Sequence, residues 1–189
     1  MKLFCFGFGQ VAQSFVDHLL SCKVDLKLIT TSRKNTSELT FKNLKYLNYE
    51  FNENDFDKDL IKPLQESDHI LISVPPINGK DMFIEKLVKN NLNLPNLKWL
   101  TYLSSTSVYG NHDGAWVNED STTNPQTPAG KNRLNVENDW LSIGTKNSLP
   151  VQIFRLSGIY SDRYNAITRL KNDQKFVVDK KDHFFSRIH

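Results

Sequence analysis

The sequence is poor in cysteine, has no long hydrophobic run and carries little excess charge of either sign. Its 189 residues include two cysteines, Cys5 and Cys22, without CxxC spacing, so the sequence predicts neither a disulfide nor a metal site. No apolar run approaches the ~20 residues that span a bilayer. The 24 Lys and Arg against 21 Asp and Glu leave a net charge of +3, too small to indicate a nucleic-acid partner. We therefore expect a globular protein of the reducing cytoplasm, with no membrane or nucleic-acid partner.

The first residues have one feature of a secretory signal peptide, because Lys2 precedes an apolar run. That run is interrupted by Gly7 and Gly9 and ends at Gln10, and no small-x-small cleavage site follows it. A strand, a turn and a helix explain the same residues better.

Short apolar runs alternate with amphipathic stretches along the chain. The patterns predict strands at residues 3–6, 26–30, 46–49, 70–74, 98–104 and 151–156, and helices at residues 10–20, 55–65, 80–89 and 131–141. Pro63 should end or kink the second of these helices. Strands that alternate with helices favour parallel pairing with right-handed crossovers. The sequence therefore predicts a single α/β domain over residues 1–189, built on a doubly wound parallel sheet.

Two segments fall outside this alternation. Residues 111–129 form the longest expected loop, rich in Asp, Asn, Thr and Pro, and such loops in compact domains are usually functional or mobile. Residues 184–189 begin a strand pattern at the point where the chain stops, so we expect a truncated chain.

The turn after the first expected strand has the pattern GxGxxA. Gly7 permits a tight turn, Gly9 lets the backbone approach a pyrophosphate, and Ala12 keeps the following helix close to the sheet. The N–H groups and the dipole at the start of that helix hold negative charge. A glycine turn in another kind of α/β protein is the alternative. The position between a strand and a helix favours a dinucleotide site, with Gln10 and Val11 beside the phosphates.

The end of the second expected strand distinguishes the two nicotinamide dinucleotides. The chain runs Thr31-Ser32-Arg33-Lys34 there, with no carboxylate until Glu38. NAD-binding proteins usually place Asp or Glu about 20 residues beyond the glycines to bind the ribose 2′-OH. A hydroxyl beside two basic side chains suits a 2′-phosphate instead. The sequence favours NADP over NAD, and a solvated basic loop is the other interpretation.

Three later segments carry motifs whose order and spacing are specific. They are YLSSTSVYG at residues 102–110, PQTPAGKNRLNVE at 125–137 and RLSGIY at 155–160. Together with the N-terminal glycines they resemble the extended short-chain dehydrogenase/reductases, the NAD-dependent epimerase/dehydratase group, over nearly the whole chain. The resemblance implies a Rossmann-type NAD(P)-binding domain. Residues 185–189 resemble a segment that in this family leads into a C-terminal substrate region, most of which we therefore expect to be missing.

The resemblance also implies a catalytic Ser, Tyr and Lys. Ser105 occupies the position that orients the substrate oxygen. The Tyr that acts as general acid/base aligns with Ala129, and the Lys aligns with Arg133. A guanidinium still hydrogen-bonds ribose hydroxyls, but it is a poor general base. The usual acid/base is therefore missing.

Three neighbouring residues are candidates to replace it. Lys131 is two helical positions from Arg133 and points about 200° around the axis, away from the cofactor. Tyr109 and His112 follow the strand and lie within reach of a substrate, although Tyr109 suits packing in its turn and His112 suits a solvated loop. We expect Ser105 and Tyr109 to be the catalytic residues. For Ser105 the alternative is that its serine-rich run satisfies backbone groups at the strand end.

Two functions fit these residues: an NADP-dependent oxidoreductase or epimerase-like enzyme with another proton donor, and a catalytically silent NADP-binding sensor or regulatory protein. The expected cofactor contacts are Gly7, Gly9, Gln10, Val11, Thr31, Ser32, Arg33, Val74, Pro75 and Arg133. The expected substrate is a small molecule, either a sugar nucleotide or another carbonyl compound. Family members often pair through two helices each, which implies a homodimer.

Overall fold

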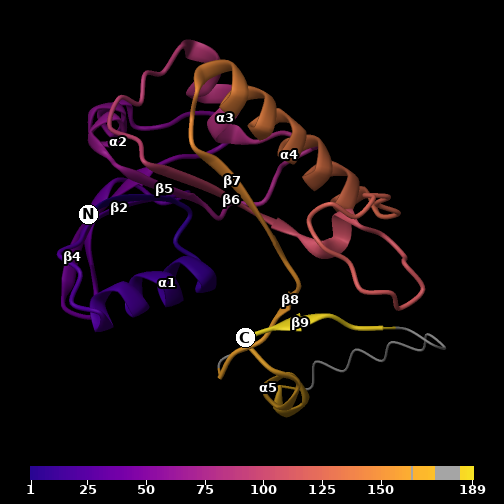
Figure 1. Ribbon diagram of the computed structural model, residues 1–189. Helices are drawn as coiled ribbons and strands as arrows, with labels where there is room; N and C mark the ends of the chain where they lie inside the picture. Colours follow the sequence, from indigo (N-terminus) through magenta and orange to yellow (C-terminus); the bar gives the residue numbers. More distant parts are fainter. Residues whose placement is uncertain (163, 173–183) are drawn as a thin grey trace.

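The structure, a computed structural model, describes residues 1–162, 164–172 and 184–189 and is built on a seven-stranded sheet (Figure 1). The strands of this sheet are β1 (Lys2–Phe6), β2 (Lys27–Ser32), β3 (Ser37–Phe41), β4 (Leu44–Glu50), β5 (His69–Ile72), β6 (Trp99–Ser105) and β7 (Val151–Leu156). The helices are α1 (Gln10–Ser21), α2 (Ile61–Glu66), α3 (Met82–Lys86), α4 (Pro128–Asn147) and α5 (Ala166–Lys171). A separate two-stranded sheet pairs β8 (Gly158–Ile159) with β9 (Arg187–Ile188).

The strand order β3-β4-β2-β1-β5-β6-β7 is that of a doubly wound fold with one added edge strand. From β1 the chain proceeds outward to β2 and β4, crosses back to β5 on the other side of β1, and continues to β6 and β7. Neighbouring strands are parallel, except that β3 pairs antiparallel with β4. The predicted α/β class and doubly wound sheet are confirmed. The order reverses between β1 and β5, and open α/β sheets bind ligands at such a point, beyond the carboxyl ends of the strands.

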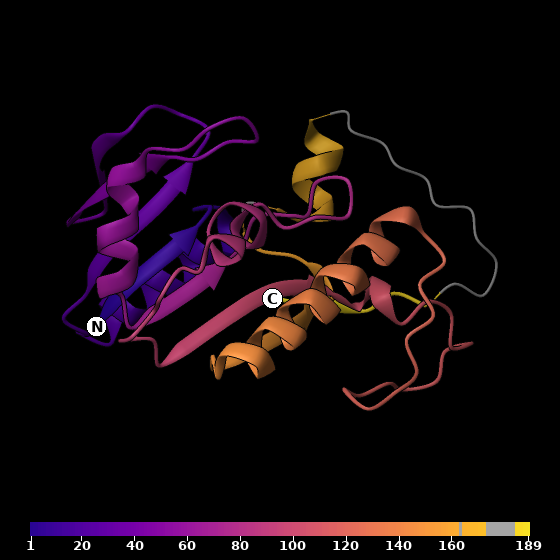
Figure 2. The ribbon, with the colours of Figure 1, turned by 90° about the horizontal axis from the view of Figure 1, so that it is seen from above.

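Both faces of the sheet are covered, which is why its central strands are almost wholly apolar. Helix α1 lies on one face, and α2, α3 and α4 lie on the other (Figure 1). Leu3 and Cys5 of β1 pack with Val16 of α1, whereas Phe4 and Phe6 belong to the cluster on the opposite face. Side chains alternate along a strand, so this single strand serves both clusters. Helix α4 covers β6 and β7 (Figure 2) and so brings its first turns to their carboxyl ends.

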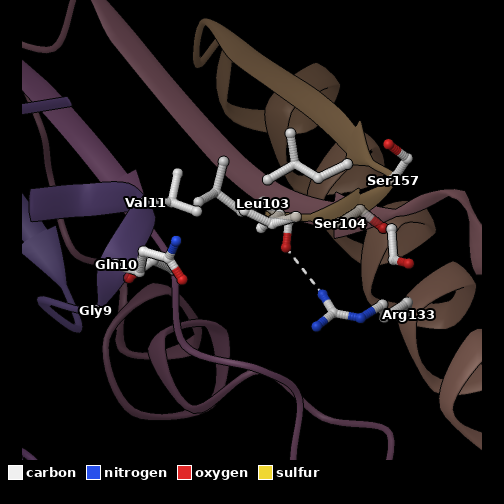
Figure 3. Close-up of a pocket in the computed structure, with 11 residues that line it drawn as sticks. Gly9, Gln10, Val11, Leu103, Ser104, Arg133 and Ser157 are labelled. Atoms are coloured by element: carbon white, nitrogen blue, oxygen red, sulfur yellow. Dashed lines mark hydrogen bonds between the residues drawn. The ribbon is translucent and has the colours of Figure 1, made fainter. Parts of the chain in front are cut away.

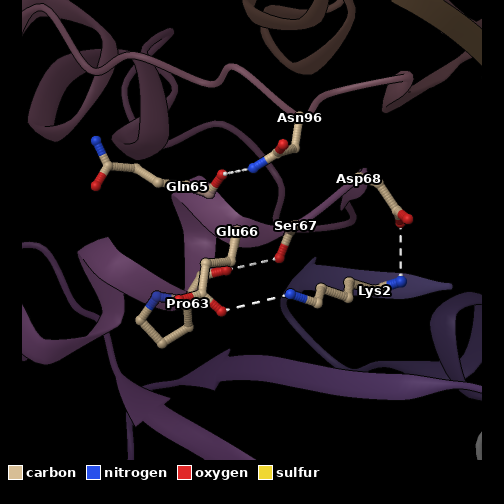
Figure 4. Close-up of polar contacts among 7 residues, drawn as sticks. All are labelled: Lys2, Pro63, Gln65, Glu66, Ser67, Asp68 and Asn96. Carbon is tan, nitrogen blue, oxygen red and sulfur yellow. Dashed lines mark hydrogen bonds and ion pairs between the residues drawn. The ribbon is translucent and has the colours of Figure 1, made fainter.

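Polar contacts tie the end of α2 to the amino ends of β1 and β5 (Figure 4). The Lys2 backbone N–H donates to the Asp68 carboxylate at 2.8 Å, and the Lys2 ammonium lies 3.5 Å from the Glu66 carboxylate. The Ser67 hydroxyl donates to the Pro63 carbonyl oxygen at 2.8 Å. These contacts fix the sheet edge that lies opposite the carboxyl ends of the strands.

The edge strand β3 is an element that the sequence analysis does not predict. Four of its five residues are exposed, and it pairs with β4 alone. A mostly polar and exposed strand lacks the apolar pattern by which strands are recognised.

Two predicted helices are shorter in the structure, and Pro63 does not end the first of them. The stretch predicted at 55–65 consists of a 3₁₀ turn at Lys58–Leu60 followed by α2, and Pro63 lies in the first turn of α2 without ending it. A first-turn residue needs no helical partner for its N–H group, so proline is tolerated there. The helix predicted at 80–89 is α3 followed by a 3₁₀ turn.

Helix α4 is longer than predicted and begins inside the predicted loop. Thr127 caps it, because its hydroxyl oxygen accepts the Gly130 N–H at 3.1 Å, and Pro128 opens the first turn. The helix then runs to Asn147. Even so, no helix within the described ranges is long and apolar enough to cross a membrane.

Candidate functional site

The turn between β1 and α1 has a shape that favours glycine. Gly7 has a φ of +81°, and a Cβ there would lie 2.9 Å from Cγ2 of Val74 and 3.0 Å from the Ser73 hydroxyl oxygen. The Gly7 N–H donates to Oγ1 of Thr31 at 3.2 Å, and the Ser73 hydroxyl lies 3.0 Å from the Gly7 carbonyl oxygen that it donates to. Residues at the ends of β1, β2 and β5 therefore fix this turn together.

Gly9 leaves free space at the start of α1. It is the N-cap residue, and a Cβ there would meet no heavy atom within 4 Å. No side chain caps the helix at this end, so its first N–H groups and the positive end of its dipole remain available. Ala12 is fully buried and lets α1 lie close to the sheet. The arrangement fits a phosphate group beside Gly9, as the motif predicts.

The glycine turn forms one end of a pocket of about 290 Å³ at the carboxyl edge of the sheet (Figure 3). Its walls also come from the residue after β5, the ends of β6 and β7, and α4. The lining residues are Gly9, Gln10, Val11, Ser73, Leu103, Ser104, Ser105, Arg133, Leu156, Ser157 and Ile159. The pocket therefore lies at the switch point of the sheet, where ligands of doubly wound folds bind.

Arg133 reaches the pocket from α4, one turn after Ala129. Its Nη1 group donates to the Leu103 carbonyl oxygen at 2.9 Å, as the dashed line in Figure 3 shows. Tyr102, next to Leu103 on β6, is fully buried in the core. Burial raises the pKa of Tyr102 to about 12, although the nearby Arg133 charge opposes that rise. Tyr102 therefore stays protonated at neutral pH and packs, as its place within a strand predicts.

Two serines at the end of β6, Ser104 and Ser105, line the pocket. The Ser105 oxygen accepts the Ser107 N–H at 3.2 Å, which caps the 3₁₀ turn that follows and leaves the Ser105 proton free to be donated. Ser104 is 4% exposed, and its hydroxyl has no hydrogen-bond partner among the described residues. Both interpretations of Ser105 therefore fit, because it satisfies a backbone group and also faces the pocket.

The residues considered as replacement proton donors lie outside the pocket lining. Tyr109 is 7% exposed, and the Arg155 guanidinium lies 4.8 Å from the centre of its ring, so Tyr109 packs in its turn. Ser105 lines the pocket and Tyr109 does not. His112 contacts a backbone carbonyl oxygen within the long loop, and Lys131 is exposed. Within the described ranges, no three His, Cys, Asp or Glu side chains gather as metal ligands.

The end of β2 holds the residues predicted to select the cofactor. Thr31 is 1% exposed, and its hydroxyl oxygen accepts the Gly7 N–H of the glycine turn. The Ser32 oxygen accepts the side-chain N–H of Asn48 at 3.0 Å and the Lys34 backbone N–H at 3.2 Å. Arg33 is exposed. This end of β2 lies apart from the pocket lining, as an adenosine site beyond the pyrophosphate would.

Val74 and Pro75 follow β5 and are likewise outside the pocket lining. Val74 packs against the glycine turn, and Pro75 is exposed.

The sequence analysis misses several residues near the site, which include Ser73, Ser157 and Glu50. Ser73 and Ser157 line the pocket directly after β5 and β7. Ligand-binding residues of parallel sheets often follow the strands in this way, so the position after each predicted strand is a signal that the sequence does contain. Glu50 lies beside Ser32 because β4 pairs with β2 in that register. The sequence holds no signal for that neighbour, since it depends on strand register.

Solved structures with this fold were found, whereas scans against protein-family models and curated proteins returned no match. A protein from Silicibacter pomeroyi DSS, described as functionally unknown, is 27% identical with a TM-score of 0.77, and the match covers 100% of this chain and 63% of that one. The UDP-glucuronic acid 4-epimerase of Bacillus cereus in complex with NAD is 21% identical with a TM-score of 0.67, over 90% and 61% of the two chains. The dTDP-glucose 4,6-dehydratase of Bacillus anthracis in complex with NAD is 17% identical with a TM-score of 0.67, over 92% and 61%.

These comparisons define the class of fold. The chain has the fold of the NAD-dependent epimerases and dehydratases, the extended short-chain dehydrogenase/reductases, which confirms the resemblance that its motifs indicate. It spans less than two thirds of the length of each of these structures.

Proposed function

We propose that this chain binds a nicotinamide dinucleotide, NADP in preference to NAD, with the pyrophosphate at the start of α1. The observation that carries the proposal is the space beside Gly9, where a Cβ would meet nothing and where uncapped helix N–H groups are available. Ser32 and Arg33 are the groups proposed to contact a 2′-phosphate. Arg133 would then contact the nicotinamide ribose from the other end of the pocket.

The first candidate function is an oxidoreductase or epimerase-like enzyme. A bound nicotinamide supplies hydride transfer, and the protein supplies orientation and a proton path. Ser105 donates its free hydroxyl proton in a hydrogen bond to the substrate oxygen. The proposed substrate is a sugar nucleotide or another carbonyl compound, in keeping with the B. cereus enzyme solved with UDP-glucuronic acid and NAD.

A catalytically silent NADP-binding sensor is the second candidate, and the pocket lining favours it. Among the described residues, the side chains around the pocket are apolar, serine, glutamine and one arginine, none of which exchanges a proton readily near neutral pH. Turnover assays with carbonyls and sugar nucleotides separate the two candidates, because a sensor binds NADPH without oxidising it. A cytoplasmic location and a homodimer stay predictions.

Nicotinamide fluorescence during titration with NADPH and with NADH tests the proposed cofactor. We expect tight NADPH binding and at least tenfold weaker NADH binding. Gly9→Ala should weaken both by at least about tenfold, or 1.4 kcal/mol, because the new methyl group occupies the phosphate position. The fold should survive this change, since the methyl group enters free space.

Ser14→Ala, on the exposed side of α1, is the matched control and should bind NADPH like the wild type. Equal affinity for NADH and NADPH would contradict the 2′-phosphate assignment alone. Unchanged binding by Gly9→Ala, or no binding by the wild type, would contradict the dinucleotide site itself.

A further inference from the structure

The two ends of the pocket differ in what they offer a ligand. The glycine turn supplies backbone N–H groups to a phosphate, whereas the far end is formed by Arg133 and Ser157 (Figure 3). Ser105 also lines the pocket. No carboxylate of the described residues lines either end, and Arg133 is the one charged side chain in the lining. The far end therefore carries a positive charge that no lining group neutralises.

Arg133 is held in place without exhausting its donors. A guanidinium has five N–H groups. The Leu103 carbonyl oxygen is the partner of one of them, through Nη1. This contact holds the planar group in the pocket lining, next to Tyr102, and leaves further donors for a ligand.

The two adjacent serines at the end of β6 differ in what they offer a ligand. Ser104 is 96% buried in the pocket wall, and its hydroxyl has no partner in the described part of the chain. This oxygen is fully buried, as are the unpaired hydroxyls of Thr101 and Tyr102 on the same strand, so it is not offered to a ligand in the pocket. Ser105 already accepts a backbone N–H and so has its own proton to offer.

Resting on the proposed dinucleotide site, we infer that the Arg133 end of the pocket binds a carboxylate group of the substrate. Arginine matches the two oxygens of a planar carboxylate with two parallel N–H donors. The cofactor's pyrophosphate is accommodated at the opposite end, beside Gly9.

The test compares UDP-glucuronic acid with UDP-glucose, which lacks the carboxylate, on the 189-residue chain loaded with NADH or NADPH. We expect at least tenfold tighter binding of UDP-glucuronic acid by the wild type, measured by calorimetry. In Arg133→Gln this preference should fall to about one. Taking the ratio of the two affinities cancels any effect of Arg133 on the shared cofactor or on the UDP group.

Lys131→Gln is the matched control, because it removes the same charge from an exposed position on the same helix. It should keep the wild-type preference. If the cofactor binds but the wild type shows no preference, or if Arg133→Gln retains it, the carboxylate site is wrong. If Arg133→Gln loses cofactor affinity while the preference persists, Arg133 serves the cofactor's own anions instead. Failure of the wild type to bind either dinucleotide would contradict the proposed function and not this inference alone.

Discussion

At the end of β2, Ser32 and Glu50 lie on neighbouring strands. A hydroxyl group can donate a hydrogen bond to a phosphate, whereas a carboxylate repels it. Ser32 accepts two N–H groups, from Asn48 and Lys34, so its own proton is free to be donated to a phosphate oxygen. Glu50 lies beside Ser32 in the sheet, and its carboxylate accepts the Asn52 side-chain N–H at 2.9 Å. Ser32 also lies next to Arg33 and Lys34 in the chain, so its hydroxyl and these basic side chains are proposed to contact the 2′-phosphate together.

Exchanging Arg33 for alanine should therefore change the choice of cofactor. Arg33→Ala should weaken NADPH binding about tenfold and NADH binding less than twofold, because a charge-assisted contact to the 2′-phosphate is lost. Fluorescence titration with both nucleotides measures the two effects. Lys45→Ala, which removes an exposed charge from β4, should leave both affinities unchanged. An equal loss for both nucleotides would place Arg33 on a part of the cofactor that they share.

Among the helices, α3 and α4 are joined by a buried carboxylate. Asp81 caps α3 by accepting the Phe83 and Ile84 N–H groups at 2.8 and 3.2 Å, and it accepts the Trp140 indole N–H of α4 at 3.3 Å. Burial raises the pKa of Asp81 above its ordinary value, although these hydrogen bonds oppose the rise. The buried position that lets Asp81 contact both helices therefore makes its carboxylate harder to ionise.

The raised pKa sets the sign of a pH dependence. Above about pH 3.8 the unfolded chain releases the Asp81 proton while the folded chain retains it, so stability falls as the pH rises until the folded pKa is passed. Asp81→Asn removes this contribution, at about 1.4 kcal/mol per unit of pKa difference. The stability of the variant relative to the wild type should thus increase with pH, in urea unfolding followed by tryptophan fluorescence from pH 4 to 8. Asp120→Asn, in the exposed loop, should show a flat difference.

How far the elements could be predicted depended on how each is buried. The residues of β1 lie between two hydrophobic clusters, and their continuous apolar run predicts a strand directly. β3 contributes little to either cluster and therefore leaves no such pattern. Thr127 and Pro128 are start signals for α4, but they stand within a run of polar residues that is equally typical of a loop.

For the site, too, residues with a local role could be predicted, whereas residues placed by distant contacts could not. Gly7, Gly9 and Ala12 predict the glycine turn because each has a local backbone role that spacing alone reveals. For Tyr109 the sequence leaves two interpretations open, a catalytic group and a packing residue, and its ring packs on Arg155, a residue far along the chain. Tertiary contacts of this kind cannot be predicted from a local pattern.

For the molecule as a whole, the pocket unites the two halves of the sheet. Gly9 and Gln10 lie at the start of α1, whereas Ser105 and Arg133 belong to the half that contains β6, β7 and α4. A dinucleotide bound there contacts both halves of the folded protein. The unfolded chain does not bring these residues together and so has no such site. Its binding energy is therefore added to the free energy of unfolding of the whole domain.

Thermal unfolding should show this coupling. NADPH at 100 times its dissociation constant should stabilise the protein by about 2.7 kcal/mol, which for a chain of this size raises the midpoint by about 5–10 °C. NADH at the same concentration should raise it less, since the proposed 2′-phosphate contacts are absent. In Gly9→Ala the ligand-free midpoint should match the wild type, because the added methyl group meets no neighbour. The same NADPH concentration should raise it by at most about half as much as in the wild type, since binding is at least about tenfold weaker. A midpoint that rises equally in this variant would mean that NADPH binds elsewhere than at the glycine turn.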